Sequence, residues 1–79
     1  MTAAELFGRK LAAARAFEGI TQKDLAKKVG LDRVTVARME HGGQLRLLRK
    51  LELLADVLDR PLSWFFEEER TRSSEEVPA

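Results

Sequence analysis

Two arginines, Arg33 and Arg38, have side chains that can recognise the edge of a nucleic-acid base. A guanidinium group donates two parallel hydrogen bonds, which match the O6 and N7 acceptors of guanine. Val34 and Ala37 lie at neighbouring positions and offer the apolar contact that suits a thymine methyl group. This chemistry requires all four side chains to face solvent from one rigid element. The elements that the sequence encodes therefore decide whether the four residues act together.

Other kinds of chemistry find little support in this chain. It contains no cysteine, which excludes a disulfide framework and a thiolate metal site. His41, the one histidine, has no paired acid, so we expect no metal ion. No glycine-rich phosphate loop or nucleophile–base pair is visible, and the acidic residues are scattered over cap and surface positions. We therefore expect neither an enzyme nor a cofactor.

The composition indicates one small domain with an uneven distribution of charge. The chain has 79 residues, no apolar run long enough to span a membrane, and no signal-peptide stretch at its N-terminus. We therefore expect a soluble, cytoplasmic protein. The net charge is +1, but residues 1–66 carry +4 and residues 67–79 carry −3. A basic body with an acidic tail is compatible with nucleic-acid binding, although an ordinary solvated surface explains the charge equally well.

The apolar residues repeat at helical spacing throughout, and no alternating strand pattern competes. Capping residues and glycines divide this pattern into helices. We expect helices over about residues 3–18, 22–29, 33–40 and 48–58, and a short fifth helix with Pro61 in its first turn. The residues predicted to face inward are Phe7, Leu11, Ala14, Leu25, Ala26, Val29, Val36, Met39, Leu48, Leu51, Ala55, Leu58, Leu62, Phe65 and Phe66.

The second and third of these helices have the spacing of a tight two-helix unit. Ala26 is small enough for the point where the helices cross, and Gly30 supplies the left-handed residue of the turn. Val36 anchors the third helix in the core. A small residue, a glycine four positions later and an apolar anchor six positions after that form the helix-turn-helix spacing. Burial of these three residues leaves the two arginines and their apolar neighbours facing outward, on a helix that fits a DNA major groove.

This region and its surroundings resemble the Cro/CI-type, or XRE-type, helix-turn-helix family of phage and bacterial repressors. The family pattern fits residues 7–66 without a gap, and the matching positions are Gly8, Arg15, Ile20, Thr21, Gln22, Leu25, Ala26, Gly30, Val36, Glu40, Gly42, Leu51, Ala55, Leu58 and Phe66. The resemblance implies an all-α fold, a compact five-helix lambda-repressor-like DNA-binding domain over residues 1–66. It also implies sequence-specific binding to double-stranded DNA, usually by a homodimer. From its composition, we expect the acidic tail, residues 67–79, to be disordered.

The resemblance also implies roles for single side chains in contacting DNA. Arg33, Val34, Ala37 and Arg38 match the positions that read bases. Gln22 matches a glutamine that holds a backbone phosphate, a role that suits an amide beside the free N–H groups of a helix N-terminus. The alternative for each of these residues is an ordinary solvated side chain.

Further residues are expected to contact the DNA backbone or to support the fold. His41 matches a position that often touches the backbone. Lys23 could supply a phosphate contact, and Thr35 could reach either a base or a phosphate. Arg15 and Glu40 match a pair that many family members bury as a structural salt bridge between the first helix and the end of the third.

The region around the fourth helix departs from the family pattern. Residues 44–47 read QLRL where the family usually has a basic-Asn-Pro turn, so the shape of this loop is not predicted. The helix also carries more apolar residues than its core face needs. We expect Leu53, Val57 and Trp64, together with Leu45, to form a homodimer interface. Scattered surface hydrophobic residues are the alternative explanation.

Three functions are compatible with this sequence. The first is a homodimeric repressor that reads a palindromic operator through its third helix in the major groove. The second is the DNA-binding antitoxin of a toxin–antitoxin pair, although the tail has almost no apolar anchor beyond Val77 for a toxin partner. The third is a protein-interaction module without DNA binding, which the two outward arginines make less attractive.

Overall fold

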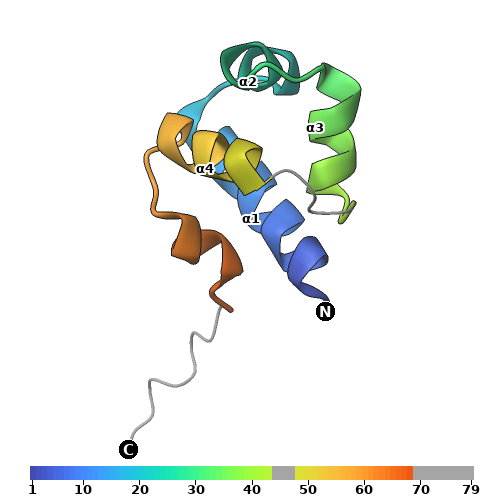
Figure 1. Ribbon diagram of the computed structural model, residues 1–79, viewed down its shortest axis with the longest axis vertical. Coiled ribbons are helices and arrows are strands. Elements are labelled where there is room, and N and C mark those ends of the chain that lie inside the picture. The colour runs from blue at the N-terminus through green and yellow to red at the C-terminus, as the bar shows by residue number, and fades with distance from the viewer. Residues whose placement is uncertain (44–47, 69–79) are drawn as a thin grey trace, which may run out of the picture.

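Five short helical elements form the described part of the chain, residues 1–43 and 48–68 of the computed structural model (Figure 1). They are α1 (Ala3–Glu18), α2 (Gln22–Val29), α3 (Arg33–Glu40), α4 (Leu48–Val57) and the 3-10 helix η1 (Leu62–Phe66). Neither of the two described ranges contains a strand. The predicted all-α fold of five elements is confirmed, with two differences. The fourth helix ends one residue early, and the fifth is a 3-10 helix rather than an α-helix.

The first two helices begin at threonine caps. The Glu5 N–H donates to the Thr2 hydroxyl oxygen at 3.0 Å, and the Thr2 N–H donates to Glu5 Oε1 at 2.9 Å, which completes a capping box. The Asp24 N–H donates to the Thr21 hydroxyl oxygen at 3.0 Å. These bonds satisfy N–H groups that have no partner inside their helices. Because the caps are local, the starts of these helices were predictable from the sequence.

The turn after α4 passes through a residue other than glycine in the left-handed conformation. Asp59 has φ of 57°, a conformation that aspartate tolerates better than most residues. The turn is closed by the Arg60 N–H, which donates to the Ala55 carbonyl oxygen at 3.0 Å. Pro61 then precedes η1 as its N-cap. The chain is thereby returned to α1, against which η1 packs.

The core is built from the inner faces of all five elements. Its buried hydrophobic residues are Phe7, Leu11, Ala14, Leu25, Ala26, Val29, Val36, Met39, Leu51, Leu54, Ala55, Leu58 and Phe65. The prediction omitted Leu54, which is fully buried and fills the face between Leu51 and Leu58. Phe66, which was predicted to face inward, lies at the edge of the core: it is 36% exposed, but its ring packs against the buried Phe7 ring, with 5.4 Å between the centroids. A 3-10 helix has three residues per turn, so it aligns Leu62 with Phe65 and places the next side chain at the edge of the core.

The crossing of α1 and α3 brings two backbones into contact. A Cβ atom added to Gly8 would lie 2.7 Å from the carbonyl oxygen of Glu40 and even closer to that of Met39. Glycine is therefore required at this position, because backbone carbonyl groups cannot rotate out of the way. The close approach holds α3 against α1 along one side, and α2 packs against another side of it. Figure 1 shows α3, in green, at the edge of the molecule.

Some expectations fall on parts of the chain that the structure does not describe. Residues 44–47, which include Leu45, lie outside the described residues, and so do residues 69–79 of the acidic tail. The predicted inward position of the Leu48 side chain also lies outside them. Within the described ranges, no helix has both the length and the apolar character to cross a membrane.

Candidate nucleic-acid interface

The turn between α2 and α3 sets the angle at which α3 is presented. Gly30 has φ of 74°, and its N–H points to the carbonyl oxygens of Ala26 and Lys27. The Leu31 N–H donates to the Ala26 carbonyl oxygen at 2.9 Å, which closes the end of α2. Asp32 then caps α3, because its Oδ1 accepts from the Thr35 N–H at 2.7 Å. The left-handed glycine, the hydrogen bond that closes α2 and the cap of α3 therefore join the two helices through only three residues.

The inner side of this unit is buried as the helix-turn-helix spacing requires. Ala26 is 2% exposed and Val36 is fully buried. On the opposite side of α3, the side chains of Arg33, Val34 and Arg38 are exposed. Val34 is 46% exposed, so an apolar side chain lies on this solvent-facing surface. The outer face of α3 therefore presents two guanidinium groups with an apolar group beside them, and Ala37 on that face is half-buried.

The residues predicted to contact phosphate lie around both ends of the unit. Gln22 is half-buried at the first position of α2, and Lys23 next to it is exposed. Thr35 is half-buried in the first turn of α3. His41 is exposed at the end of α3, where its Nδ1 lies 2.9 Å from the Ala37 carbonyl oxygen. Because that oxygen can only accept, Nδ1 must carry a proton, and Nε2 donates only when the imidazole is charged.

The structure brings Arg15 of α1 and Glu40 of α3 together as an ion pair. Arg15 donates from Nε to Glu40 Oε2 at 2.6 Å and from its second guanidinium nitrogen to Oε1 at 3.2 Å. The Glu40 side chain is 6% exposed and that of Arg15 is 21% exposed. The hydrogen bond with Glu40 raises the pKa of Arg15 above its ordinary value. The pair ties the two helices together on the side of α1 that faces α3.

A chain of hydrogen bonds extends this ion pair to the outer face of α3. Gln22 donates from Nε2 to Glu40 Oε1 at 2.9 Å. The same side chain accepts, at Oε1, a bond of 3.0 Å from the Arg33 guanidinium group. Arg15, Glu40, Gln22 and Arg33 are thus linked in series, and we call these four residues the relay. The sequence did not predict that Gln22 and Arg33 touch, although each is the first residue of its helix.

One carboxylate lies next to the two arginines of the outer face. Asp32 is exposed, and hydrogen bonds from Thr35 hold its pKa below the ordinary value. The charges of Arg38 and Arg33 lower it further. Asp32 is therefore a charged cap at neutral pH, and its charge partly offsets the positive charge of the surface around it.

The residues predicted to form a dimer interface occupy different environments. Leu53 on α4 is 42% exposed, whereas Val57 and Trp64 are half-buried and pack against the core. The Trp64 ring is also covered by two cations, with Lys10 Nζ at 4.3 Å and Arg60 Cζ at 4.4 Å from its centroid. The part of this surface that is free to contact another protein is therefore centred on Leu53.

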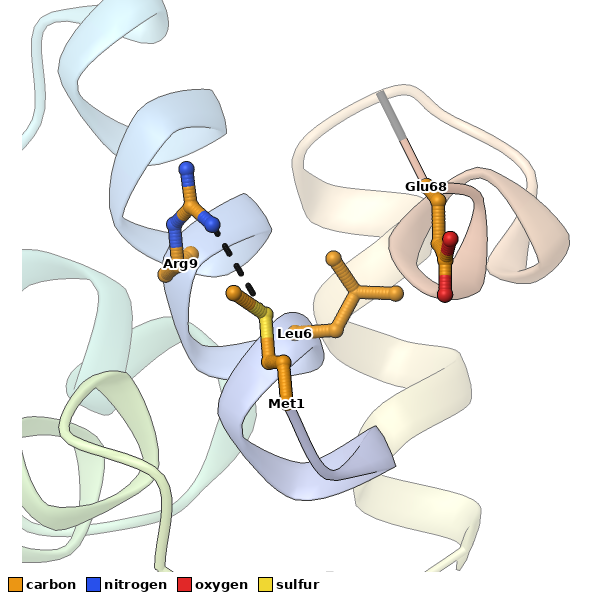
Figure 2. Close-up of a pocket in the computed structure, with 4 residues that line it drawn as sticks. All are labelled: Met1, Leu6, Arg9 and Glu68. Carbon is orange, nitrogen blue, oxygen red and sulfur yellow. Dashed lines mark hydrogen bonds between the residues drawn. The ribbon is translucent and has the colours of Figure 1, made fainter. Parts of the chain in front are cut away.

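Shallow hollows elsewhere on the surface offer less specific chemistry. Figure 2 shows the one between the start of α1 and the end of η1, which is lined by Met1, Leu6, Arg9 and Glu68. A guanidinium nitrogen of Arg9 lies 3.7 Å from the Met1 sulfur, and Glu68 lies across the hollow. Among residues 1–43 and 48–68, no group of three or more His, Asp or Glu could hold a metal ion. The outer face of α3 is therefore the stronger candidate site.

Comparisons with known proteins agree with this geometry. The chain matches the model of the helix-turn-helix family over residues 11–65. It is similar to the solved structure of the restriction-modification controller protein C.AhdI from Aeromonas hydrophila, with a TM-score of 0.73 and 33% identity over 80% of this chain and 91% of that chain. A hypothetical transcription factor, NHTF from Neisseria, has the same fold, with a TM-score of 0.80 and 22% identity over 90% of this chain and 82% of that one. No curated protein matches the chain.

Proposed function

The chain belongs to the Cro/CI-type, or XRE-type, helix-turn-helix family of DNA-binding transcriptional regulators, and from this premise we propose that it is a homodimeric repressor. In this proposal it reads a palindromic operator by placing α3 in the major groove. One observation carries it: the outer face of α3 is exposed and holds two arginines on a scaffold fixed by the Gly30 turn and by contact with α1.

In the complex, the outer face of α3 supplies the base contacts. Arg33 and Arg38 are assigned to guanine, with two hydrogen bonds each to O6 and N7. Val34 and Ala37 are assigned to apolar contacts with thymine methyl groups. The exposure of Val34 supports this assignment, because an apolar side chain in water gains from being covered by DNA.

Backbone contacts around this face fix the orientation of the helix on the duplex. We assign them to Gln22, Lys23, Thr35 and His41. These residues lie at the starts of α2 and α3 and at the end of α3, so they would contact the DNA strands on either side of the groove. The free N–H groups at the start of α2, whose cap is an uncharged threonine, also favour phosphate. Such contacts raise affinity for every sequence and make binding depend on salt.

Homodimerisation is proposed through the exposed Leu53 of α4, together with the half-buried Val57 and Trp64; Leu45, the fourth residue of the predicted interface, lies outside the described residues. A two-fold dimer would place two copies of α3 about 34 Å apart, one turn of DNA. The exposed Leu53 side chain supports this surface. Such a dimer would read a palindromic operator, because each copy of α3 would contact one half-site.

Selection of DNA from a random pool tests the proposal most directly. We expect a palindrome whose half-sites are separated by about 10 base pairs, one helical turn. The Arg38→Ala variant should lose about 1–3 kcal/mol of binding free energy and relax the preference at one base pair of each half-site. A selected pool without any preferred sequence, or an unchanged preference in the variant, would contradict the assignment of α3 as the reading helix.

A second candidate concerns the genes that are regulated. C.AhdI is a restriction-modification controller protein, and its identity to this chain is 33% over most of both chains. Control of restriction-modification genes is therefore a specific form of the proposed function. It predicts that the selected operator lies upstream of such genes. The antitoxin alternative has no observation in its favour within the described residues, and a toxin would be revealed as a second band of equal stoichiometry on purification.

A further inference from the structure

The relay connects the interior of the domain to a side chain that is assigned to read a base. At one end, Arg15 and Glu40 form an ion pair in which the Glu40 side chain is 6% exposed. At the other end, Arg33 is exposed on the outer face of α3. Gln22 bridges them, with bonds of 2.9 Å to Glu40 and 3.0 Å to Arg33. A change in the interior pair can therefore reach the outer face through one amide.

The direction of this amide follows from the chemistry of its neighbours. An ionised carboxylate only accepts hydrogen bonds, so Glu40 must receive the NH₂ group of Gln22. The carbonyl oxygen of Gln22 then has to point away from Glu40, towards Arg33. A guanidinium group only donates, so this oxygen is the atom that Arg33 can use. If the amide were rotated by half a turn, both contacts would be lost, because donor would face donor and acceptor would face acceptor.

A tethered Arg33 has less freedom to lose when it binds a base. An exposed arginine samples many rotamers in solution, and ordering them opposes binding. The bond to Gln22 leaves four of the five guanidinium N–H donors for other partners. Arg33 can therefore stay bonded to Gln22 while it donates two hydrogen bonds to guanine.

We infer that Gln22 is a positioning residue for Arg33, and that Glu40 sets the direction of the Gln22 amide, so that the interior ion pair helps to determine which base pair α3 prefers. This inference rests on the proposed DNA-binding function. It differs from a purely electrostatic role for Gln22, in which the amide holds a phosphate and contributes equally to every sequence. One N–H of Gln22 remains for a phosphate, so the same structure permits both roles. They differ in what a Gln22 variant should lose: preference at one base pair in the positioning role, and affinity for every sequence equally in the phosphate role.

The two roles are separated by measuring base preference in a double-mutant cycle. The variants are Gln22→Met, Arg33→Met and the double mutant, because methionine matches the length of glutamine, keeps most of the aliphatic stem of arginine, and removes the hydrogen bonds of both. Affinities for the selected operator and for every single-base variant of one half-site are measured by fluorescence anisotropy at one salt concentration. Arg33→Met should reduce the preference at one base pair by about 5- to 150-fold. Gln22→Met should reduce the preference at the same base pair by about three- to tenfold, since the guanidinium group must then be ordered on binding.

The outcome of the double-mutant cycle depends on whether the losses of base preference in Gln22→Met and Arg33→Met add in the double mutant. We expect Gln22→Met to have no further effect on that preference once Arg33 is replaced, because the amide acts only through the guanidinium group. The neighbouring variant Lys23→Met is the matched control, and it should weaken all sequences by one factor. If Gln22→Met behaves like this control, the inference is overturned and the proposed function stands. If the wild-type protein shows no sequence preference, the proposed function fails and the inference fails with it.

A second variant tests the part assigned to Glu40. Glu40→Gln introduces an NH₂ group that competes for the position of Oε1, which accepts from Gln22 and from the second guanidinium nitrogen of Arg15, while its oxygen still accepts from Arg15 Nε. The Gln22 amide should then turn its oxygen inward and its NH₂ group towards Arg33. We expect the preference at the Arg33 base pair to fall about three- to tenfold at a temperature where circular dichroism shows the variant folded. A folded variant whose preference is unchanged would overturn the role of Glu40.

Discussion

Removal of the Glu40 carboxylate should destabilise the domain more than most single substitutions. In Glu40→Ala, the two bonds from Arg15 and the one from Gln22 are lost together. Arg15 keeps one bond, of 2.9 Å, to the Ile20 carbonyl oxygen. Its guanidinium group is then left with a single partner at a site where water reaches only part of it, since the Arg15 side chain is 21% exposed.

The size of the effect follows from this partial exposure. Loss of one partner from a fully buried pair costs about 3–5 kcal/mol. Water can reach Arg15 more easily than Glu40, which is 6% exposed, so we expect the lower end of the range, about 3 kcal/mol. For a domain of this size, that corresponds to a fall in Tm of roughly 12–24 °C. The cost is a large share of the roughly 5–15 kcal/mol that holds a small domain folded.

Urea denaturation followed by circular dichroism at 222 nm measures this loss. The matched control is the double variant Arg15→Met/Glu40→Leu, which replaces both charged side chains with somewhat shorter apolar ones. Because it leaves no unpaired charge, it should be more stable than Glu40→Ala by about 1 kcal/mol or more. The reasoning is refuted if Glu40→Ala costs less than about 1 kcal/mol with an unchanged m value, the range of an exposed ion pair.

Three further predictions test other features of the structure. Gly8→Ala should destabilise the domain by about 3 kcal/mol, because its Cβ would collide with backbone carbonyl oxygens of α3; the same change in an unobstructed helix stabilises by about 1 kcal/mol, so a gain in Tm would contradict the close crossing. The pKa of Asp32 is lowered in the folded state, so ionised Asp32 stabilises the fold above its ordinary pKa. This contribution is lost as the pH falls through the pKa of the folded state. Urea midpoints measured from about pH 5 to about pH 2 should therefore fall more steeply for wild type than for Asp32→Asn. Leu53→Glu should convert a dimer into a monomer in sedimentation measurements, whereas Phe17→Glu, at an even more exposed position, should leave the mass unchanged; equal behaviour of the two variants would exclude the proposed surface.

The local parts of the fold could be predicted from the sequence because short-range chemistry determines them. Thr2 and Thr21 cap the helices that follow, and both caps are present as expected. Gly30 is left-handed where the turn requires it. Each of these features depends on residues within three or four positions of one another. Such features survive any arrangement of the rest of the chain, so a single sequence is sufficient to locate them.

The remaining features depend on contacts between elements, which spacing alone does not determine. Leu54 is an exception, because it follows Leu51 by three residues and precedes Leu58 by four, so helical spacing indicates its burial and the prediction overlooked it. The partial exposure of Phe66, by contrast, depends on η1 being a 3-10 helix packed on α1, where the Phe66 ring contacts Phe7. The bond between Gln22 and Arg33 is a contact of the same kind, because it spans two helices and needs the observed crossing angle.

Under the proposed function, the Gln22–Arg33 bond links the stability of this domain to its base preference. In a domain whose core and reading surface were independent, a substitution at Glu40 would lower stability and leave base preference intact. Here the same carboxylate accepts from Arg15 and from Gln22, and the Gln22 amide accepts from Arg33. A substitution that weakens the interior pair should therefore alter what α3 reads before the domain unfolds. Restoring stability elsewhere, for example by a better helix cap, should recover the Tm without recovering the original base preference, because no cap can redirect the Gln22 amide.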